Sequence, residues 1–373
     1  MAKAPSALTD LLLTLPSSAF KRIAKLRGSM YDSGVLTSHA VPVPVVSIGN
    51  ITAGGTGKTP ITSWLTNELK QRGLACGIVS RGYGGTEKGP KRVPADGLDE
   101  TALRFGDEPS WLAATHPETP VVIGGDRVRD VEELLKHSSV QMVLADDAFQ
   151  HRRLKRDLDL VVIDATEPRW HYRPLPLGRM REGFESLARA KFVFLSKTNR
   201  ASEEQLSWIR GNLRDLQIRY KFKVIEFESV LAGFVPLKEN RADAAVVANP
   251  FAERRDGSTA KKSRFVVMTA IGRPAVFSDM VIEQTGGEVA EAFEFRDHHV
   301  FTEEDRKRVQ SRAVQLKARA ILVTEKDATK LHGWEPKVAC YVSRLIARPV
   351  LESSHWEATA LQELYETIGR LVR

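Results

Sequence analysis

The feature that most constrains this chain is the segment VPVVSIGNITAGGTGKTP at residues 43–60. Its apolar beginning favours a strand buried on both faces, and its glycines favour a tight loop before a helix. Residues 52–59 fit the pattern G-x-x-x-x-G-K-[ST], in which backbone N–H groups, a lysine and a hydroxyl bind phosphates and Mg²⁺, except that Thr52 replaces the first glycine. A glycine-rich turn with an incidental lysine is the alternative. The pattern predicts a phosphate-binding loop made by Thr52, Ala53, Gly54, Gly55, Thr56, Gly57, Lys58 and Thr59.

A pair of acidic residues follows a second apolar run. The run Gln141–Ala145 leads directly into Asp146 and Asp147. Carboxylates at such a strand end reach the metal ion beside a phosphate loop, and a cation relieves the repulsion between them. We therefore predict a metal site at these two residues. A strand-terminal turn with one capping aspartate is the alternative, and Asp164 at the end of another apolar run is a competing candidate.

Short β-rich runs alternate with helical patterns, which predicts βαβ units and a largely parallel sheet. We expect strands at Val43–Ile48, Ala75–Ser80, Pro120–Ile123, Gln141–Ala145, Leu158–Asp164 and Lys191–Ser196. We expect helices among them at Ile61–Arg72, Arg127–His137 and Glu203–Leu216. In a second α/β unit we expect strands near Phe265–Ala270, Ala320–Thr324 and Ala339–Val342, and helices near Pro274–Gln284, Glu303–Ala318 and Trp356–Val372.

Residues 237–263 interrupt this alternation because they are polar, charged and rich in turn formers, so we interpret them as a linker or insertion. The predicted fold class is α/β: a P-loop NTPase-like parallel sheet core with a smaller C-terminal α/β domain and an N-terminal amphipathic helix. The expected boundaries are 1–38 for the helix, 39–236 for the core and 264–373 for the C-terminal domain.

The composition is that of a globular enzyme with an anionic partner. The 373 residues are 42% hydrophobic and 27% charged, with a formal net charge of +8. This charge favours nucleic acid, anionic lipid or a phosphorylated substrate. Aromatic residues are only 7% and scattered, which argues against a platform for single-stranded nucleic acid. Cys76 and Cys340 lie in apolar runs and predict buried thiols, with no disulfide or zinc site.

The N-terminal residues join an apolar segment to a basic one. Leu8–Leu15 is rich in leucine, and Lys21–Arg27 contains four basic residues. No run of about 18 apolar residues occurs, so a spanning helix is not expected, and the charge order is the reverse of a signal peptide. The pattern predicts a helix that lies in a membrane interface, with an ordinary helix packed on the domain as the alternative.

Two polar clusters lie at predicted turns in the core. SRGYGG at 80–85 follows a strand, and Arg81 and Tyr83 could bind a phosphate or a sugar there, although a simple turn would have the same composition. GDEP at 106–109 places Asp107 at the start of a helix. Acidic residues at that position are also good N-terminal caps, so capping is the alternative to a catalytic role.

Three further clusters contain charged residues or histidine. HRRLKR at 151–156 is either a solvated face or a site for substrate phosphate, since arginine forks suit bidentate phosphate binding. GRMRE at 178–182 offers Glu182 in a loop. DHH at 297–299 offers an Asp–His pair, with a surface or capping role as the alternative. These ligands are too few for a zinc site.

Taken together, these segments resemble the tetraacyldisaccharide 4′-kinases, the lipid A 4′-kinases of Gram-negative bacteria. Ala148 stands where this family commonly has glycine, and Gly183 where it commonly has proline. DDAFQHRRL and TEKDATKL are specific to the family rather than to phosphate-loop proteins at large. The resemblance is collinear over nearly the whole chain and rests on RGSMYDSG, VPVPVVSIGNITAGGTGKTP, SRGYGG, GDEP, GGDR, DDAFQHRRLKRDLDLVVID, PLGRMREG, AIGRP, DHHVFT and TEKDATKL.

The resemblance implies roles for the candidate residues. Asp107 and His298 would form a general-base pair, in which either Asp107 orients His298 or Asp107 accepts the proton and His298 tunes it. The predicted catalytic residues are Lys58, Asp107, Asp147 and His298. The predicted metal ligands are Thr59, Asp146 and Glu182. The residues expected to face the substrate are Arg81, Tyr83, Arg127, His151 and Arg152.

The resemblance also implies a reaction and its setting. ATP and Mg²⁺ would be the cofactors, and the γ-phosphoryl group would pass to the 4′-hydroxyl of a tetraacylated glucosamine disaccharide 1-phosphate in lipid A biosynthesis. The N-terminal helix would hold the enzyme, as a peripheral monotopic protein, on the anionic cytoplasmic face of the bacterial inner membrane. No nucleic-acid partner is implied, and the oligomeric state is left open. The alternative is a membrane-associated P-loop ATPase that acts on a protein partner.

Deletion of residues 1–38 should lower vesicle binding and activity on lipid vesicles more than it lowers ATP binding. An acylated substrate does not leave the bilayer readily, because burial of each CH₂ is worth about 0.8 kcal/mol, so the enzyme has to bind the surface. Vesicle flotation and nucleotide titration of both chains measure the difference. Unchanged vesicle binding after the deletion would refute the interfacial role.

Overall fold

The computed structural model describes residues 7–96, 99–240, 244–252, 262–351, 356 and 359–372. The chain divides into two units, each defined by its internal contacts. The first unit comprises Met1–Arg81, Gly124–Ser229 and Ala347–Arg373, and the second comprises Gly82–Ile123 and Val230–Ile346. Both units combine segments that are distant in sequence. The two units do not coincide with the domains expected from the sequence, and the expected domain boundaries stay predictions.

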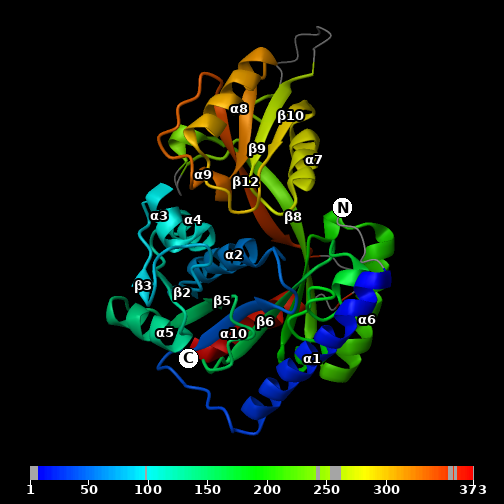
Figure 1. Cartoon of the computed structure of the whole chain (residues 1–373). Coiled ribbons are helices and arrows are strands. Elements are labelled where there is room, and N and C mark those ends of the chain that lie inside the picture. Colours follow the sequence, from blue (N-terminus) through cyan, green and yellow to red (C-terminus); the bar gives the residue numbers. More distant parts are fainter. Residues whose placement is uncertain are drawn as a thin grey trace. The chain divides into compact units, whose positions relative to one another are not determined.

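A parallel sheet with strand order β2-β5-β1-β6-β7-β8 forms the centre of the first unit (Figure 1). The connection after β1 leads to β2, on one side of β1 in the sheet, whereas the connection after β6 leads to β7, on the other side. Parallel sheets bind ligands outside the carboxyl ends of the strands at such a reversal, and the phosphate-binding loop begins there. The predicted α/β fold class is confirmed. The strands are β1 (Val45–Asn50), β2 (Cys76–Ser80), β5 (Met142–Asp146), β6 (Leu158–Asp164), β7 (Phe192–Ser196) and the first part of β8 (Lys223–Pro236).

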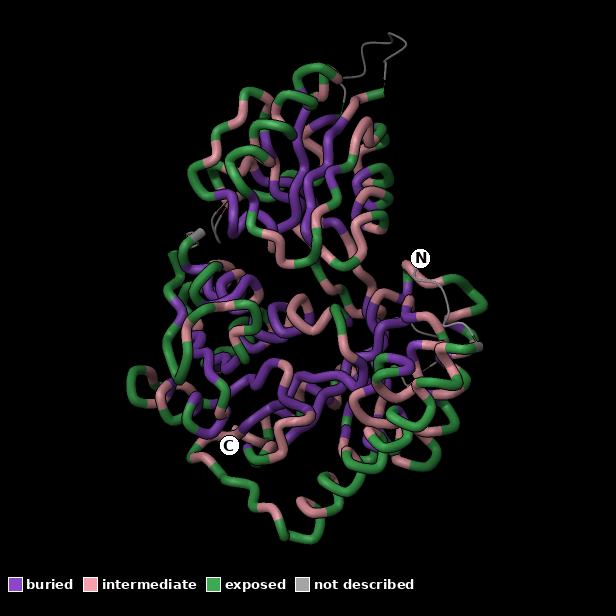
Figure 2. The backbone as a smooth tube through the Cα atoms, in the orientation of Figure 1, coloured by how far each residue is buried: buried purple, intermediate pink, exposed green. Residues whose placement is uncertain are grey.

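Helices cover this sheet, which explains why its strands are nearly continuous apolar runs. Every residue of β1, β2, β5, β6 and β7 is buried (Figure 2). Helix α2 (Lys58–Gln71) packs on β1, β2 and β5, and α5 (Arg127–Lys136) packs on β2. Helix α6 (Glu203–Tyr220) packs Leu206, Ile209 and Leu213 in one cluster with residues of β6 and β7. The last helix is α10 (Ala360–Val372).

Helix α1 (Ala7–Asp32) is attached to the first unit by polar contacts. Ser17 donates to the carbonyl of Pro174 at 2.8 Å, and Arg152 pairs with Asp32 at 2.7 Å. Six large apolar side chains of α1 are 63–80% exposed: Leu8, Leu11, Leu12, Leu15, Ile23 and Leu26. The first four have the i, i+3, i+4, i+7 spacing of one helix face. Among the described residues, no helix combines the length and apolar character needed to cross a membrane.

The second unit contains a smaller parallel sheet with strand order β10-β9-β11-β12. Phe265 and Val267 of β9 pack with α7, whereas Val266 and Met268 pack with α8, because alternate residues of a strand point to opposite faces. The strands are β9 (Arg264–Thr269), β10 (Glu288–Glu294), β11 (Ala320–Thr324) and β12 (Cys340–Pro349), and the helices are α7 (Pro274–Thr285) and α8 (Glu303–Gln315).

Residues 82–123 complete the second unit. Strands β3 (Lys91–Arg92) and β4 (Val121–Ile123) pair antiparallel, and α3 (Asp99–Phe105) precedes α4 (Asp107–Thr115). Helix α4 contacts the short helix α9 (Glu325–Ala328). This contact brings Asp107 to the TEKDATKL segment. Short 3₁₀ turns elsewhere in the chain lie at Arg169–His171, Phe184–Arg189, Thr198–Arg200 and Leu237–Glu239.

Three parts of the chain differ from the expected elements. Helix α2 already begins at Lys58, because the lysine of the phosphate-binding loop is part of the first helical turn. Strands β8 and β10 were not expected. The sequence EVAEAFE of β10 has a glutamate at every third position, so it lacks the alternation that predicts a strand, and its charges suit the end strand of a sheet. In the polar stretch 237–263, Val247 forms a bridge with Phe234 of β8, while residues 241–243 and 253–261 lie outside the described residues.

Gly49→Ala should destabilise the first unit and weaken nucleotide binding. A Cβ at Gly49 of β1 would lie 2.8 Å from the backbone nitrogen of Phe149, which follows the acidic pair, and overpacking of this kind costs about 1–3 kcal/mol. Gly211→Ala is the control, because a Cβ there meets nothing within 4 Å on helix α6, and it should stabilise by roughly 0.5–1 kcal/mol. Denaturant unfolding measures both. Equal effects of the two substitutions would contradict the packing argument.

Candidate functional site

The loop between β1 and α2 is held by hydrogen bonds to its carbonyl groups. Ser196 Oγ donates to the carbonyl of Thr56, and Lys197 Nζ donates to that of Gly55, both at 2.8 Å. Asn50 Nδ2 also donates to Thr56 Oγ1 at 3.0 Å. The first N–H groups of a helix have no partner within the helix, so the N-terminus of α2 is suited to bind a phosphate.

The glycines of this loop are required by its shape. Gly54 and Gly57 have φ angles of 116° and 87°, in the left-handed region that favours glycine. The backbone of the GRMRE segment runs beside the loop, since Ala53 N donates to the carbonyl of Arg179 at 2.7 Å. Thr52 forms a bridge with Met180 and is 3% exposed. This pairing explains how the loop accommodates threonine at the first position of the pattern.

Lys58 and Asp147 meet at the end of the phosphate-binding loop. Lys58 Nζ lies 3.4 Å from Asp147 Oδ1, and Arg181 Nη1 lies 3.1 Å from the same oxygen. Burial acts to raise the pKa of Asp147, but the charges of Lys58 and Arg181 more than offset it, so this pKa lies below its usual value. The carboxylate is therefore ionised and can hold the lysine beside the phosphate site.

Asp146 is held by two hydroxyl groups. Thr62 Oγ1 donates to Oδ1 at 3.2 Å and Ser80 Oγ donates to Oδ2 at 3.1 Å, and Asp146 is 2% exposed. Mg²⁺ at nucleotide sites is usually bound by a hydroxyl, one or two carboxylates, water and the phosphates themselves. Thr59, Asp146 and Asp147 fit this donor set. Within the described ranges, no group of three or more His, Cys, Asp or Glu residues could hold a metal ion. A metal ion here would therefore also need the hydroxyl, water and phosphate ligands.

Glu182 lies between the loop and α1. It pairs with Arg189 at 2.6 Å, and its backbone nitrogen donates to the carbonyl of Ile51 at 3.4 Å. Together with Lys21 and Lys25 of α1 it lines a cavity of about 310 Å³. Its contact with a metal ion stays a prediction.

Asp164, the competing acidic candidate, has a different partner. Its Oδ2 pairs at 2.6 Å with Lys197, which also donates to Gly55 of the loop. Asp164 thus anchors a lysine that supports the loop. Sequence reasoning missed Lys197. The available signal was its position directly after β7, whose carboxyl end lies beside that of β6.

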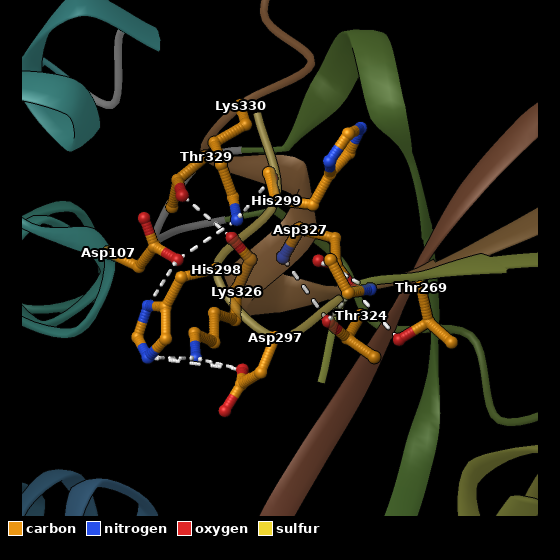
Figure 3. A network of polar contacts seen from close by, with 11 residues as sticks. Asp107, Thr269, Asp297, His298, His299, Thr324, Lys326, Asp327, Thr329 and Lys330 are labelled. Atoms are coloured by element: carbon orange, nitrogen blue, oxygen red, sulfur yellow. Dashed lines mark hydrogen bonds and ion pairs between the residues drawn. The ribbon is translucent and has the colours of Figure 1, made fainter. Parts of the chain in front are cut away.

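A second constellation lies in the second unit (Figure 3). Asp107, the first residue of α4, is 7% exposed. Its Oδ2 lies 3.2 Å from His298 Nδ1 and 2.9 Å from Lys330 Nζ. Burial acts to raise the pKa of Asp107, but the hydrogen bond from His298 and the charges of Lys330 and Lys326 outweigh it, so this pKa lies below its usual value. The predicted Asp–His pair therefore forms within one unit.

His298 has contacts on both ring nitrogens. Its Nε2 lies 3.3 Å from Lys326 Nζ, which in turn pairs with Asp297 at 3.0 Å. The ring of Tyr83 packs edge-on against the imidazole at 5.5 Å between centroids. The backbone of His298 has a φ of 64° and is held by a hydrogen bond to the carbonyl of Ala270.

Unusual backbone conformations coincide with these sites. Lys221 and Lys317 have positive φ angles at the C-terminal ends of α6 and α8, where such conformations are common. Asp147, Lys197 and His298 also have positive φ angles but lie at the candidate sites. Strained backbone in non-glycine residues clusters at functional sites, so these three positions support the assignment.

The basic residues expected to face a substrate have partners within the protein. Arg127 is 2% exposed and pairs with Asp130 at 3.1 Å. His151 Nε2 accepts from Arg127 N at 3.4 Å, and burial, followed by the charge of Arg127, lowers the pKa of His151 to about 4. Arg152 donates to the carbonyl of Gly28 in α1 at 2.8 Å. Direct contact of these residues with substrate stays a prediction.

The SRGYGG and GDEP motifs meet around one turn. Arg81 is exposed and Tyr83 is 68% exposed. Gly106, the N-cap of α4, has a φ of 93°, and a Cβ there would come 2.5 Å from the carbonyl oxygen of Tyr83. The glycine before Asp107 is therefore required for the turn. Acidic capping of α4 and a functional role for Asp107 are compatible.

A profile of the family described as tetraacyldisaccharide-1-P 4′-kinase matches residues 9–364. The chain belongs to the tetraacyldisaccharide 4′-kinase family. A relative of that name from Bdellovibrio bacteriovorus is 35% identical over 318 residues, which cover 84% of this chain and 87% of the relative. Another from Anaeromyxobacter dehalogenans (strain 2CP-C) is 35% identical over 327 residues, which cover 87% of this chain and 82% of the relative. The resemblance stated from the motifs is confirmed.

A solved structure of a 4′-kinase has the same fold. The crystal structure described as the "apo" form of LpxK from Aquifex aeolicus in complex with ATP matches with a TM-score of 0.70 and 25% identity. The match covers 97% of this chain and 98% of that one. The fold of this 4′-kinase family member therefore extends over both units.

Sequence reasoning also missed Lys326 and Lys330. Both lie in TEKDATKL, which was noted as a family-specific motif without a role for any of its residues. A lysine in a polar segment is usually solvated, and only the packing of α4 against α9 reveals that Lys330 is 2% exposed.

Lys58→Met should raise the Kd for ATP by at least about tenfold, because a hydrogen bond to a charged group is worth roughly 1.5–3 kcal/mol. Lys70→Met removes an exposed lysine from the other end of α2 and is the control. Isothermal titration with ATP measures both. If Lys58→Met bound ATP as the Lys70 variant does, the assignment of the phosphate-binding loop would be lost.

Proposed function

We propose that this chain is an ATP-dependent kinase that phosphorylates the 4′-hydroxyl of a tetraacylated glucosamine disaccharide 1-phosphate in lipid A biosynthesis. The observation that carries the proposal is the phosphate-binding loop with Lys58 paired to Asp147, in a chain that matches the 4′-kinase family over residues 9–364. The buried carboxylate of Asp107 supplies the group that a transfer to an alcohol needs and that ATP binding alone does not.

The first unit binds the nucleotide in this proposal. Phosphoryl transfer proceeds through a loose transition state, so catalysis consists mainly of positioning and charge neutralisation. The N-terminus of α2 and Lys58 bind the phosphates, and Arg181 beside Asp147 adds positive charge. Thr59, Asp146 and Asp147 would hold Mg²⁺, which supplies neutralisation of the phosphate charge when bound.

Asp107 is the proposed general base. Its pKa below the usual value keeps it ionised at neutral pH. His298 and Lys330 both engage Oδ2, so Oδ1 is the oxygen that would accept the proton. His298 is a poorer acceptor because its Nε2 faces the ammonium group of Lys326 at 3.3 Å. Of the two arrangements considered from the sequence, this geometry favours proton transfer to Asp107, with His298 as the partner that orients it.

Helix α1 is the proposed membrane contact. Its exposed leucines form one face, and the chain carries an excess of positive charge, as suits an anionic lipid surface. A lipid substrate remains in the bilayer during the reaction, so an enzyme that lies on the cytoplasmic face of the inner membrane can reach the sugar headgroup. This location also provides access to ATP.

The alternative, a membrane-associated ATPase that acts on a protein partner, requires ATP binding without transfer to a lipid. Incubation with radiolabelled ATP and the disaccharide 1-phosphate, followed by thin-layer separation, distinguishes the two. Labelled lipid is expected. Release of free phosphate with no labelled lipid would support the ATPase and overturn the kinase.

Asp107→Asn should lower the rate of lipid phosphorylation by about 10²–10⁴-fold with an unchanged Kd for ATP, because general-base catalysis contributes that much and the nucleotide is bound by the first unit. Glu108→Gln changes the neighbouring acidic residue of α4 and is the control. Steady-state kinetics on mixed micelles measures both. Wild-type turnover in the Asp107 variant would remove this residue from the mechanism.

A further inference from the structure

Two lysines of the TEKDATKL segment converge on the Asp107–His298 pair from different sides (Figure 3). Lys330 Nζ contacts Asp107 Oδ2 at 2.9 Å, and Lys326 Nζ contacts His298 Nε2 at 3.3 Å. The two side chains differ in environment, since Lys330 is 2% exposed at the side chain and Lys326 is 20% exposed. Each partner of the pair thus has its own lysine.

The segment that carries these lysines is fixed to the sheet of the second unit. Asp327, between them, accepts hydrogen bonds from the hydroxyls of Thr269 and Thr324 and from the backbone nitrogen of Ala270. Arg306 Nη2 donates to the carbonyl of Lys330 at 2.8 Å. The backbone around the lysines therefore has a defined position, from which the ammonium groups reach Asp107 and His298.

Lys330 is buried, so its positive charge has to be compensated by groups of the protein. An ammonium group leaves water at a large cost unless it is paired and hydrogen-bonded. Lys330 Nζ is paired with Asp107, donates to the carbonyl of His299 at 3.0 Å and lies 5.6 Å from the centre of the Phe301 ring. The ammonium and the Asp107 carboxylate are therefore mutually dependent, because each would be costly to bury alone.

The contact of Lys326 decides which nitrogen of His298 carries a proton. An ammonium group has donors and no acceptor, so His298 Nε2 has to accept from it. The imidazole proton then resides on Nδ1, which faces Asp107 Oδ2 at 3.2 Å. The imidazole consequently donates to the carboxylate, and the orientation of this hydrogen bond follows from the position of Lys326.

We propose that Lys326 and Lys330 are positioning residues that fix the protonation of the pair: Lys330 holds Asp107 as a carboxylate, and Lys326 holds His298 as the Nδ1–H tautomer that donates to it. The inference rests on the proposed function, in which Asp107 accepts the proton of the substrate hydroxyl. Through these contacts, Asp107 enters the reaction ionised and oriented.

Several charged groups on the elements that pack against α4 pair with other residues. On α3, Arg104 pairs with Glu87 at 2.6 Å and with Glu100 at 3.7 Å. On α9, Glu325 pairs with Arg344 at 2.6 Å. Four further titratable groups lie on these elements and on the 297–299 loop: Glu108, Asp297, His299 and Asp327. Asp297 pairs with Lys326 at 3.0 Å, and His299 pairs with Asp305 at 2.9 Å. Among the side chains described, His298 and Lys330 are those in direct contact with the Asp107 carboxylate.

The pH profile of kcat/KM tests the role of Lys330. Removal of a positive charge next to Asp107 raises the pKa of that carboxylate, so the active ionised form is lost at higher pH as the solution is acidified. An opposite charge at this distance lowers an aspartate pKa by roughly 1–3 units, so Lys330→Met should move the acid limb upward by about one unit or more. The KM for ATP should stay unchanged. Lys330→Arg, which keeps the charge, should restore the wild-type limb.

Lys307→Met is the control for this experiment, because Lys307 is an exposed lysine of α8 in the same unit, with a side chain 72% exposed. Its acid limb should coincide with that of the wild type. An acid limb that is equally unmoved in Lys330→Met would overturn the role of Lys330, even if turnover were lower, because a purely structural defect lowers the rate without moving the limb.

Nitrogen-15 NMR of ring-labelled histidine tests the role of Lys326 without any substrate. His298, assigned by comparison with His298→Gln, should show the Nδ1–H tautomer in the wild type. Lys326→Met should shift the population toward the Nε2–H tautomer. The same tautomer population in both proteins would overturn the role of Lys326. The partial exposure of Lys326 makes this variant expected to fold even where Lys330→Met does not.

The two experiments separate this inference from the proposed function. If the wild-type protein made no phosphorylated lipid, the kinase proposal would fail, yet the tautomer measurement would still decide what Lys326 does to His298. If the wild type made the lipid product but both lysine variants retained the wild-type acid limb and tautomer, the kinase proposal would stand and the positioning inference would fail.

Discussion

The close approach of Gly49 to Phe149 is the constraint on which the nucleotide side of this molecule depends. Strands β1 and β5 are parallel neighbours, and their register places Ile48 opposite Asp146. The phosphate-binding loop and the acidic pair therefore leave the sheet at the same edge. A Cβ at position 49 would meet Phe149, so the missing side chain lets the loop after β5 pack against β1. The contact of Lys58 with Asp147 follows from this packing.

Electrostatic compensation of one buried carboxylate organises the second unit. Burial alone would favour the neutral acid at Asp107, but His298 and Lys330 both engage its Oδ2 and reverse the preference. Groups arranged before the substrate arrives need no reorganisation during the reaction, which is the main advantage of a preformed polar site. The backbone of His298 fits this view, because its left-handed φ of 64° is the kind of strain that clusters at functional sites.

Sequence reasoning was most informative where the signal is local, and it left alternatives open where a charged side chain has several available partners. The alternation of apolar runs and helical patterns predicted most strands of both sheets within a few residues. The basic run at 151–156 had two interpretations, a solvated face or a substrate site, and in the structure its Arg152 contacts α1. Arg127, also expected to face substrate, pairs with Asp130 in the interior. Contact of either residue with substrate stays a prediction. A run of arginines has the same pattern whether it binds a ligand or anchors a helix. The partner alone makes the difference.

The sequence by itself determined the phosphate-binding loop, the acidic strand end and the family, because glycine requirements, strand periodicity and collinear motifs are encoded in neighbouring residues. Only the tertiary structure decided that residues 82–123 pack with residues 230–346, which joins Asp107 to His298 across 191 positions. It also decided that Lys326 and Lys330 support this pair. Such contacts depend on how whole elements pack, and the side-chain pattern of one element does not specify which polar groups another element will bring to it.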